Sequence, residues 1–177
     1  EESFHREQRY IHMNRRVLSL LVDNTSGVLS RVAGLFSRRG YNIDSLTVGE
    51  TADPRYSRMT VVARGDEQIL DQIVKQLAKL IDVVDIKVLE DENSVNRELV
   101  LAKVRADAHD RQSVITIANI FRGNIIDVGK DSLIIELTGQ QSKLDAFLKL
   151  LDGYEILELA RTGITGLSRG ADDIRYL

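Results

Sequence analysis

The sequence predicts an α+β protein made of two tandem β-α-β-β-α-β domains. Apolar runs of strand length alternate with longer stretches of helical periodicity, and the same element order occurs twice around a polar, acidic stretch. Gly40 and Gly123, each following the first helix of its half, lie 83 residues apart (123 − 40 = 83). The same offset carries the first strand of one half onto that of the other. The repeat is therefore one of element order and spacing.

In the first half, residues 16–22 form a short apolar run bounded by turn residues, which indicates a buried strand. Apolar residues at i, i+3, i+4 and i+7 spacings follow from Val28 to Phe36, which predicts an amphipathic helix that ends at Gly40. The remaining elements are strands at 43–48 and 59–63, joined by a loop with the only proline, a helix at 66–81 and a strand at 83–89.

The second half repeats this order after the polar residues 90–94. Its predicted elements are strands at 99–104, 124–128, 133–137 and 156–161, and helices at 113–121 and 141–151. Each half then forms a ferredoxin-like sandwich, an antiparallel sheet with two helices on one face and its first and third strands in the centre. The predicted domains are 15–90 and 98–170, with a flexible extension at 1–14, a linker at 91–97 and a tail at 171–177.

Composition limits the function classes. The chain has 177 residues, no cysteine and a net charge of −3, so disulfides and thiolate chemistry are excluded and nothing favours a nucleic-acid or membrane partner. RNA-recognition domains share the element order but stack bases on aromatic residues of their central strands, and RVLSLLV and RMTVVA have none. No apolar run approaches the roughly 20 residues that span a bilayer, and no secretory start is visible. We expect a cytoplasmic protein.

Size also predicts self-association. A domain of about 80 residues buries only roughly 60% of its unfolded surface. A two-layer sandwich would leave one bare sheet face and two edge strands, and edge-to-edge pairing of two chains would satisfy the unpaired groups. We therefore expect a homodimer.

The turn Asn24-Thr25-Ser26-Gly27 is the leading candidate site. Thr25 or Ser26 can cap the following helix, and Gly27 lets a ligand or another chain approach the backbone. The N-terminus of a helix also offers unpaired N–H groups and partial positive charge, which favour a carboxylate. A plain helix cap and an anion site both explain the turn.

Asn42, just past the other end of this helix, strengthens the ligand interpretation. Together with Asn24 it could provide donors and acceptors for the ammonium and carboxylate of an α-amino acid. Alternatively, Asn42 only tolerates a left-handed turn after Gly40. The two interpretations are compatible.

Other chemistry-bearing residues form no catalytic or metal pattern. Arg31, Arg38 and Arg39 are interpreted as a solvated helix face, and the three histidines are scattered without partners at ligand spacing, so no metal site is expected. No Ser-His-Asp pattern, Walker motif or GxGxxG occurs. A small acylphosphatase-like enzyme would need an Arg or Lys cradle at the first turn, where Asn, Thr, Ser and Gly stand. We expect no catalytic residues.

Longer blocks of sequence carry a family resemblance. Residues 15–62, RRVLSLLVDNTSGVLSRVAGLFSRRGYNIDSLTVGETADPRYSRMTVV, resemble the start of the small regulatory subunit of acetolactate synthase (acetohydroxyacid synthase), which begins with an ACT domain. The later blocks FRGNIIDV at 121–128, KLDAF at 143–147 and RTGITGLSRG at 161–170 are similar to the same family. The resemblance covers roughly residues 15–170, and the extension before Arg15 departs from it.

The resemblance implies a non-catalytic subunit in branched-chain amino-acid biosynthesis. Such a subunit binds and activates the large catalytic subunit and confers feedback inhibition by valine, isoleucine or leucine, held between the ACT domains of two small subunits. It implies no cofactor in this chain, with thiamine diphosphate, Mg and FAD expected only on the catalytic partner. A stand-alone amino-acid-sensing regulator of ACT type is the alternative.

The resemblance also names effector-binding positions. Asn24, Gly27 and Asn42 match the family's effector motif, with Thr25, Ser26, Val28 and Ile43 close by. The corresponding turn of the second half, residues 106–110, reads Ala-Asp-Ala-His-Asp. Because it lacks the Asn-Thr-Ser-Gly pattern, we expect no matching effector site there.

Overall fold

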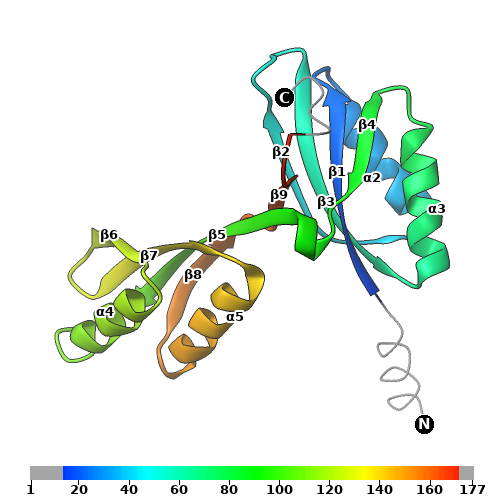
Figure 1. The fold of residues 1–177 in the computed structure, drawn as a ribbon. Helices are drawn as coiled ribbons and strands as arrows, with labels where there is room; N and C mark the ends of the chain where they lie inside the picture. The colour runs from blue at the N-terminus through cyan, green and yellow to red at the C-terminus, as the bar shows by residue number, and fades with distance from the viewer. Residues whose placement is uncertain (1–13, 172–177) are drawn as a thin grey trace, which may run out of the picture. The chain divides into compact units, whose positions relative to one another are not determined.

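The predicted element order is present in both halves of the chain (Figure 1). The computed structural model describes residues 14–171, so the predicted extension and tail lie outside the described residues, apart from Asn14 and Ala171. The first unit contains β1 (Asn14–Asp23), α2 (Val28–Arg39), β2 (Asn42–Glu50), β3 (Tyr56–Gly65), α3 (Glu67–Ala78), β4 (Val83–Val88) and the short 3-10 helix η1 (Asp91–Asn93).

The sheet of the first unit has the strand order β2-β3-β1-β4, and all neighbours are antiparallel. The first and third strands are therefore central, as the right-handed crossover rule predicts. Alternate residues of β1, namely Leu18, Leu20 and Val22, pack with the apolar stripes of α2 and α3 in one core.

Local sequence explains the ends of the two helices. Gly40 adopts a left-handed conformation with φ 65°, and the N–H of Tyr41 returns to the carbonyl of Phe36 at 2.9 Å, which ends α2 as predicted. Asp66 caps α3, because its side chain accepts the N–H of Ile69 at 2.8 Å. This helix ends at Ala78, three residues before the predicted end at Ile81.

The second unit has the same arrangement. It holds most of β5 (Ser94–Arg105), then α4 (Arg111–Ile120), β6 (Asn124–Val128), β7 (Ser132–Gly139), α5 (Gln141–Leu150), the short 3-10 helix η2 (Leu151–Gly153) and β8 (Ile156–Arg161), in the sheet order β6-β7-β5-β8. Its core includes Val100, Val104, Phe147 and the edge-to-face contact of Phe121 with Phe147 at 5.6 Å between ring centroids.

The boundary between the units differs from the sequence prediction. The units divide at Val95/Asn96 and again at Ile164/Thr165, so the chain returns to the first unit. The predicted linker 91–97 is instead η1 followed directly by β5, and residues 165–170, assigned above to the second domain, include a further strand, β9 (Thr165–Ser168). The polar linker interpretation failed because β5 begins within the polar stretch.

Strand β9 also changes the expectation of a bare sheet face. Val17, Leu21 and Thr60 lie on the face of the first sheet that carries no helix, yet all three are buried. The N–H of Gly166 in β9 donates to Oγ1 of Thr60 at 3.4 Å, and the N–H of Arg169 donates to the carbonyl of Asn93 at 2.7 Å. The C-terminal strand therefore covers part of this face.

Candidate functional site

The turn between β1 and α2 is tied to the β2–β3 loop by Asn24. The Asn24 N–H donates to the carbonyl of Arg55 at 2.7 Å, and its side-chain Nδ2 donates to the carbonyl of Pro54 at 2.9 Å and to Oε2 of Glu50 at 3.1 Å. Asn24 therefore holds two loops together at one end of the sheet. Its side-chain donors face the β2–β3 loop and not the helix.

The helix cap differs from the sequence prediction. Gly27 itself is the N-cap of α2, in a left-handed conformation with φ 86° and ψ −8°, and no side chain among residues 14–171 accepts a cap hydrogen bond there. Thr25 and Ser26 are exposed. The prediction that one of them caps the helix is wrong, because the backbone enters α2 through a left-handed glycine. The consequence is a helix N-terminus whose first N–H groups lack a side-chain acceptor.

Arg31, in the first turn of α2, is a residue near this site that the sequence analysis placed on the solvated helix face. Its Nε and Nη2 form a bidentate pair with the Asp82 carboxylate at 2.5 and 3.0 Å, and its Nη1 lies 2.8 Å from the position that a Cβ on Gly27 would occupy. The hydrogen bond from Arg31 lowers the pKa of Asp82, and the same bond raises the pKa of Arg31. Arg31 is therefore a fixed cation beside Gly27.

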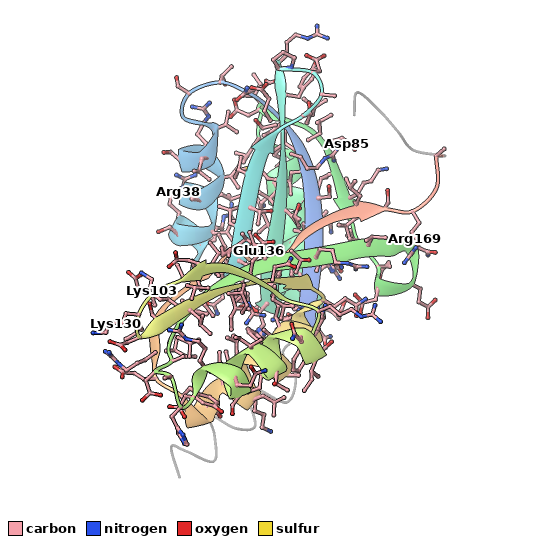
Figure 2. The ribbon with its side chains drawn as sticks, turned by 90° about the vertical axis from the view of Figure 1, so that its left-hand side faces the viewer. Arg38, Asp85, Lys103, Lys130, Glu136 and Arg169 are labelled. Carbon is pink, nitrogen blue, oxygen red and sulfur yellow. The ribbon has the colours of Figure 1, made fainter. Side chains whose placement is uncertain are left out.

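The other two arginines of the helix fit the solvated interpretation better. Arg38 is exposed on α2 (Figure 2), and Arg39 is exposed with one hydrogen bond of 3.2 Å from Nη2 to Oε1 of Gln76. The three arginines looked alike in sequence. Only Arg31 is one turn from Gly27, and only contact with Asp82, 51 residues away, distinguishes it.

Asn42 is not close to Asn24 within one chain. In the sheet, Asn42 pairs with Arg64, and Arg64 pairs with Arg15 at the start of β1, whereas Asn24 follows the last residue of β1. At the rise per residue of a helix or a strand, the two asparagines are roughly 20–30 Å apart. The two asparagines therefore cannot contact one small ligand within a single chain.

The two apolar candidates have different environments. Val28 is 4% exposed and packs into the core, so only its backbone remains available at the turn. Ile43 is half-buried and packs against the same core from β2. Of the predicted positions, the structure brings Asn24, Thr25, Ser26, Gly27 and Val28 together at one end of α2 and leaves Asn42 and Ile43 at the other.

Comparisons with known proteins agree with this architecture. Residues 18–85 match the family model of the AHAS small subunit-like ACT domain, and residues 97–170 match that of the small subunit of acetolactate synthase. The chain belongs to the acetolactate synthase small-subunit family. The first unit is thus an ACT domain, as the resemblance implied.

Individual relatives support the same assignment. The chain is 53% identical over 156 residues to the probable acetolactate synthase small subunit of Methanothermobacter thermautotrophicus, covering 88% of this chain and 93% of the relative. It is 52% identical over 157 residues to the isozyme 3 small subunit of Escherichia coli, covering 88% and 96%. The crystal structure of the Thermotoga maritima small subunit superposes with a TM-score of 0.83 at 44% identity, covering 89% and 99%.

The ACT unit of this small subunit and its second unit differ at the equivalent turn. In the second unit, Oδ1 of Asp107 accepts the N–H of His109 at 2.9 Å and of Asp110 at 3.0 Å, just before α4 begins. These bonds lower the pKa of Asp107. The second unit thus supplies its own carboxylate at the turn, which gives a physical reason for the expectation that it lacks an effector site.

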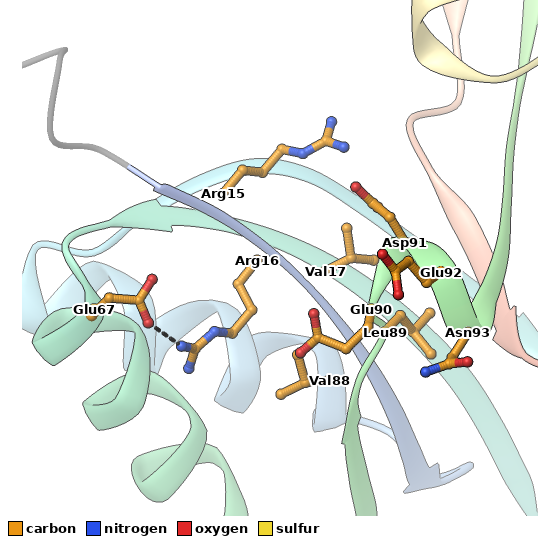
Figure 3. A pocket seen from close by; sticks show the side chains of 10 residues that line it. All are labelled: Arg15, Arg16, Val17, Glu67, Val88, Leu89, Glu90, Asp91, Glu92 and Asn93. Atoms are coloured by element: carbon orange, nitrogen blue, oxygen red, sulfur yellow. Dashed lines mark hydrogen bonds and ion pairs between the residues drawn. The ribbon is translucent and has the colours of Figure 1, made fainter.

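A separate pocket of about 550 Å³ lies in the ACT unit near the start of β1 (Figure 3). Charged side chains dominate its lining, including Glu90, Asp91 and Glu92, and Nη2 of Arg16 donates to Oε2 of Glu67 at 2.8 Å. None of the predicted effector residues lines it. Among the described residues, no three His, Cys, Asp or Glu side chains are grouped to hold a metal ion, and no helix is long and apolar enough to cross a membrane.

Proposed function

We propose that this chain is the regulatory subunit of acetolactate synthase. It binds the large catalytic subunit, raises its activity and confers feedback inhibition by valine or another branched-chain amino acid, without catalytic residues of its own. Thiamine diphosphate, Mg and FAD belong on the large subunit only. The observation that carries the proposal is the uncapped N-terminus of α2 in a chain of this family.

The effector's carboxylate binds at the Gly27 turn. The first N–H groups of α2 point out of the helix end without a side-chain acceptor, and the helix dipole adds partial positive charge there. The left-handed Gly27 carries no side chain that would fill this space. Asn24 keeps the neighbouring β2–β3 loop in place through Pro54 and Glu50.

The rest of the site comes from a second copy of the chain. Within residues 14–171, β2 is an edge strand that pairs only with β3, and Val48 on it is 49% exposed. Antiparallel pairing of two β2 edges about a two-fold axis brings Asn42 of one copy toward the Glu50 end of the other, where Asn24 is held. The dimer thereby joins the two halves that a single chain keeps apart.

A site at this interface also explains regulation. An effector that contacts both copies binds one dimer arrangement better than another and shifts the population toward it. A coupling of about 1–3 kcal/mol between the effector site and the large subunit is sufficient for feedback inhibition.

Calorimetric titration of the dimeric chain with L-valine, L-leucine and L-isoleucine tests the proposal, followed by assay of the large subunit with and without this chain. We expect heat with at least one amino acid, a rise in activity on reconstitution and inhibition by the amino acid that binds. Absence of binding by all three would overturn effector sensing. Binding without any effect on the large subunit would instead favour a stand-alone ACT-type regulator.

A further inference from the structure

We propose that Arg31 is a direct ligand of the effector's carboxylate and that Asp82 positions it. This inference rests on the proposed function, because it adds a residue and a required chemical group to the same effector site. Nothing in the sequence pattern around Arg31 distinguished it from Arg38 and Arg39, and its role follows from the contacts that the fold creates.

The first step is the direction of the side chain. Arg31 stands four positions after Gly27, so both residues lie on one side of the helix end, and helical side chains lean toward the N-terminus. The Arg31 N–H donates to the carbonyl of Gly27 at 3.0 Å, in the first hydrogen bond of the helix. Its guanidinium therefore returns over the turn, with Nη1 against the Gly27 backbone.

The second step concerns which N–H donors of Arg31 the Asp82 carboxylate occupies. Nε and Nη2 of Arg31 donate to that carboxylate, and Nη1 takes no part in the pair. A guanidinium offers five N–H donors in a rigid fork. The two N–H groups of Nη1 therefore lie on the side of the fork nearest the N-terminus of α2, where a carboxylate would accept them together with the backbone N–H groups.

The third step is preorganisation. Asp82 is 6% exposed, and the N–H of Asp23 donates to the Asp82 carbonyl at 2.9 Å, which fixes the residue against the end of β1. A bidentate pair with a fixed carboxylate holds the guanidinium in one orientation before any ligand arrives. Arg31 then loses little side-chain freedom when the effector binds.

The second unit provides independent support for the ligand's chemistry. At the equivalent turn the chain places the Asp107 carboxylate on two backbone N–H groups. The ACT unit has the neutral Asn24 at the matching position, 83 residues earlier (107 − 83 = 24), and directs its side chain to the β2–β3 loop. In the second unit the Asp107 side chain supplies the carboxylate at this turn. In the ACT unit the bound effector therefore supplies the equivalent carboxylate.

The chemical class of effector follows from this pairing. The site requires a free α-carboxylate, and an amino-acid amide of the same side chain lacks the negative charge that Arg31 and the helix N-terminus bind. A charge-assisted hydrogen bond corresponds to a change of about 10- to 100-fold in affinity. The side chain of the effector takes no part in the contact with Arg31.

The experiment compares L-valine with L-valinamide on the full-length dimer by calorimetry, or the best-binding amino acid with its amide. Arg31→Gln should weaken binding of the amino acid about 10- to 100-fold while leaving the weak binding of the amide unchanged. Arg31→Lys keeps the charge but not the fork, and an intermediate loss is expected. Arg38→Gln is the matched control, since it removes the same charge from the same helix, and it should bind as the wild type does.

The outcomes separate this inference from the proposed function. Wild-type affinity in Arg31→Gln, or an amide that binds as tightly as the amino acid, overturns the role of Arg31 while effector sensing stands. Failure of the wild type to bind any of the three amino acids overturns the proposed function. If Arg31→Gln does not fold, as judged by circular dichroism, Arg31→Lys decides. The intermediate loss of affinity supports the contact between Nη1 of Arg31 and the effector's carboxylate, and an unchanged affinity overturns it.

Discussion

Asn24 and Asn42 lie at opposite ends of helix α2, and the strand register puts Asn42 beside the start of β1 while Asn24 follows its end. Two residues roughly 20–30 Å apart cannot contact one amino acid within a chain. The two-fold dimer proposed above changes this, because each of its two proposed sites combines the Gly27 end of one copy with the Asn42 end of the other.

This arrangement predicts complementation between two defective variants. Gly27→Asp puts a carboxylate beside Arg31 at the anion position, and Asn42→Ala removes the polar group of the other half-site. Each variant alone should lose effector binding. In a mixed dimer one site carries both changes and the other carries neither, so unfolding and refolding a one-to-one mixture should restore roughly a quarter of the wild-type sites, as counted by calorimetry.

The control is the same treatment of each variant by itself, which should restore nothing. No recovery in the mixture, with mixed dimers shown to form by mass spectrometry, would contradict a site shared between two copies. In that case, the loss of binding in Gly27→Asp alone would still test whether the effector binds at the Gly27 turn.

The Arg31–Asp82 pair predicts an acid-range pH dependence of stability. The folded-state pKa of Asp82 is lowered by the hydrogen bond from Arg31, so the carboxylate stabilises the fold above its usual pKa, near 3.8. That contribution is lost as the pH falls from this value through the lower folded-state pKa. We expect wild type and Asp82→Asn to differ in urea denaturation at pH 6 and the difference to shrink progressively below about pH 4.

A constant difference between the two proteins from pH 6 to pH 2 would show that the charge of Asp82 makes no contribution. Asp66→Asn serves as a comparison, since Asp66 accepts the N–H of Ile69 at the start of α3 and has no arginine partner among residues 14–171. The Asn side chain keeps an oxygen that can accept the Ile69 N–H. The free energy of unfolding should therefore change less in Asp66→Asn than in Asp82→Asn.

The fold could be predicted because it depends on periodic apolar residues and on local end signals. The spacing from Val28 to Phe36 and the left-handed Gly40 define α2, and Asp66 marks the start of α3. The strand β9 could not be predicted in the same way. Its four residues, Thr-Gly-Leu-Ser, have no clear alternation, and the contact of Gly166 with Thr60 is known only from the folded chain.

The candidate site was predictable in part for the same physical reason. The polar turn and its glycine are local features, so the N-terminus of α2 was found at the right place. The capping residue could not be predicted, since Thr and Ser are both favourable N-cap residues and only the backbone angles of Gly27 exclude Thr25 and Ser26. The orientation of Arg31 depends on its contact with Asp82, 51 residues away in the sequence, which a local pattern cannot reveal.

In the second unit, the pairing of Arg161 with Glu98 predicts a large effect of a single substitution. Glu98 is 5% exposed and accepts Nε and Nη2 of Arg161 at 3.1 and 2.9 Å, while Nη1 donates to Asp145 at 2.8 Å. Arg161→Met leaves the Glu98 carboxylate buried without its cation, and we expect a loss of about 2–4 kcal/mol in the free energy of unfolding. Urea denaturation measures it.

Two further variants test the cause. Lys103→Met removes a cation of the same sheet whose partner, Glu158, is exposed, so stability should change little. Adding Glu98→Leu to Arg161→Met should recover much of the loss, because no buried charge then remains. A double variant as unstable as Arg161→Met would mean that packing of the Arg161 stem, and not the buried carboxylate, causes the loss.

The return of the chain through β9 predicts that its removal destabilises the ACT unit, although β9 follows the second unit in sequence. A chain that ends after Ile164 loses the Gly166 N–H that Thr60 accepts and uncovers part of the sheet face around Thr60. Amide hydrogen exchange should therefore become faster in β1 and β3, while α4 and α5 keep their protection. A chain that ends after Gly170 retains β9 and should match the full-length protein. Faster exchange confined to the second unit would instead assign residues 165–170 to that unit, as the sequence alone had suggested.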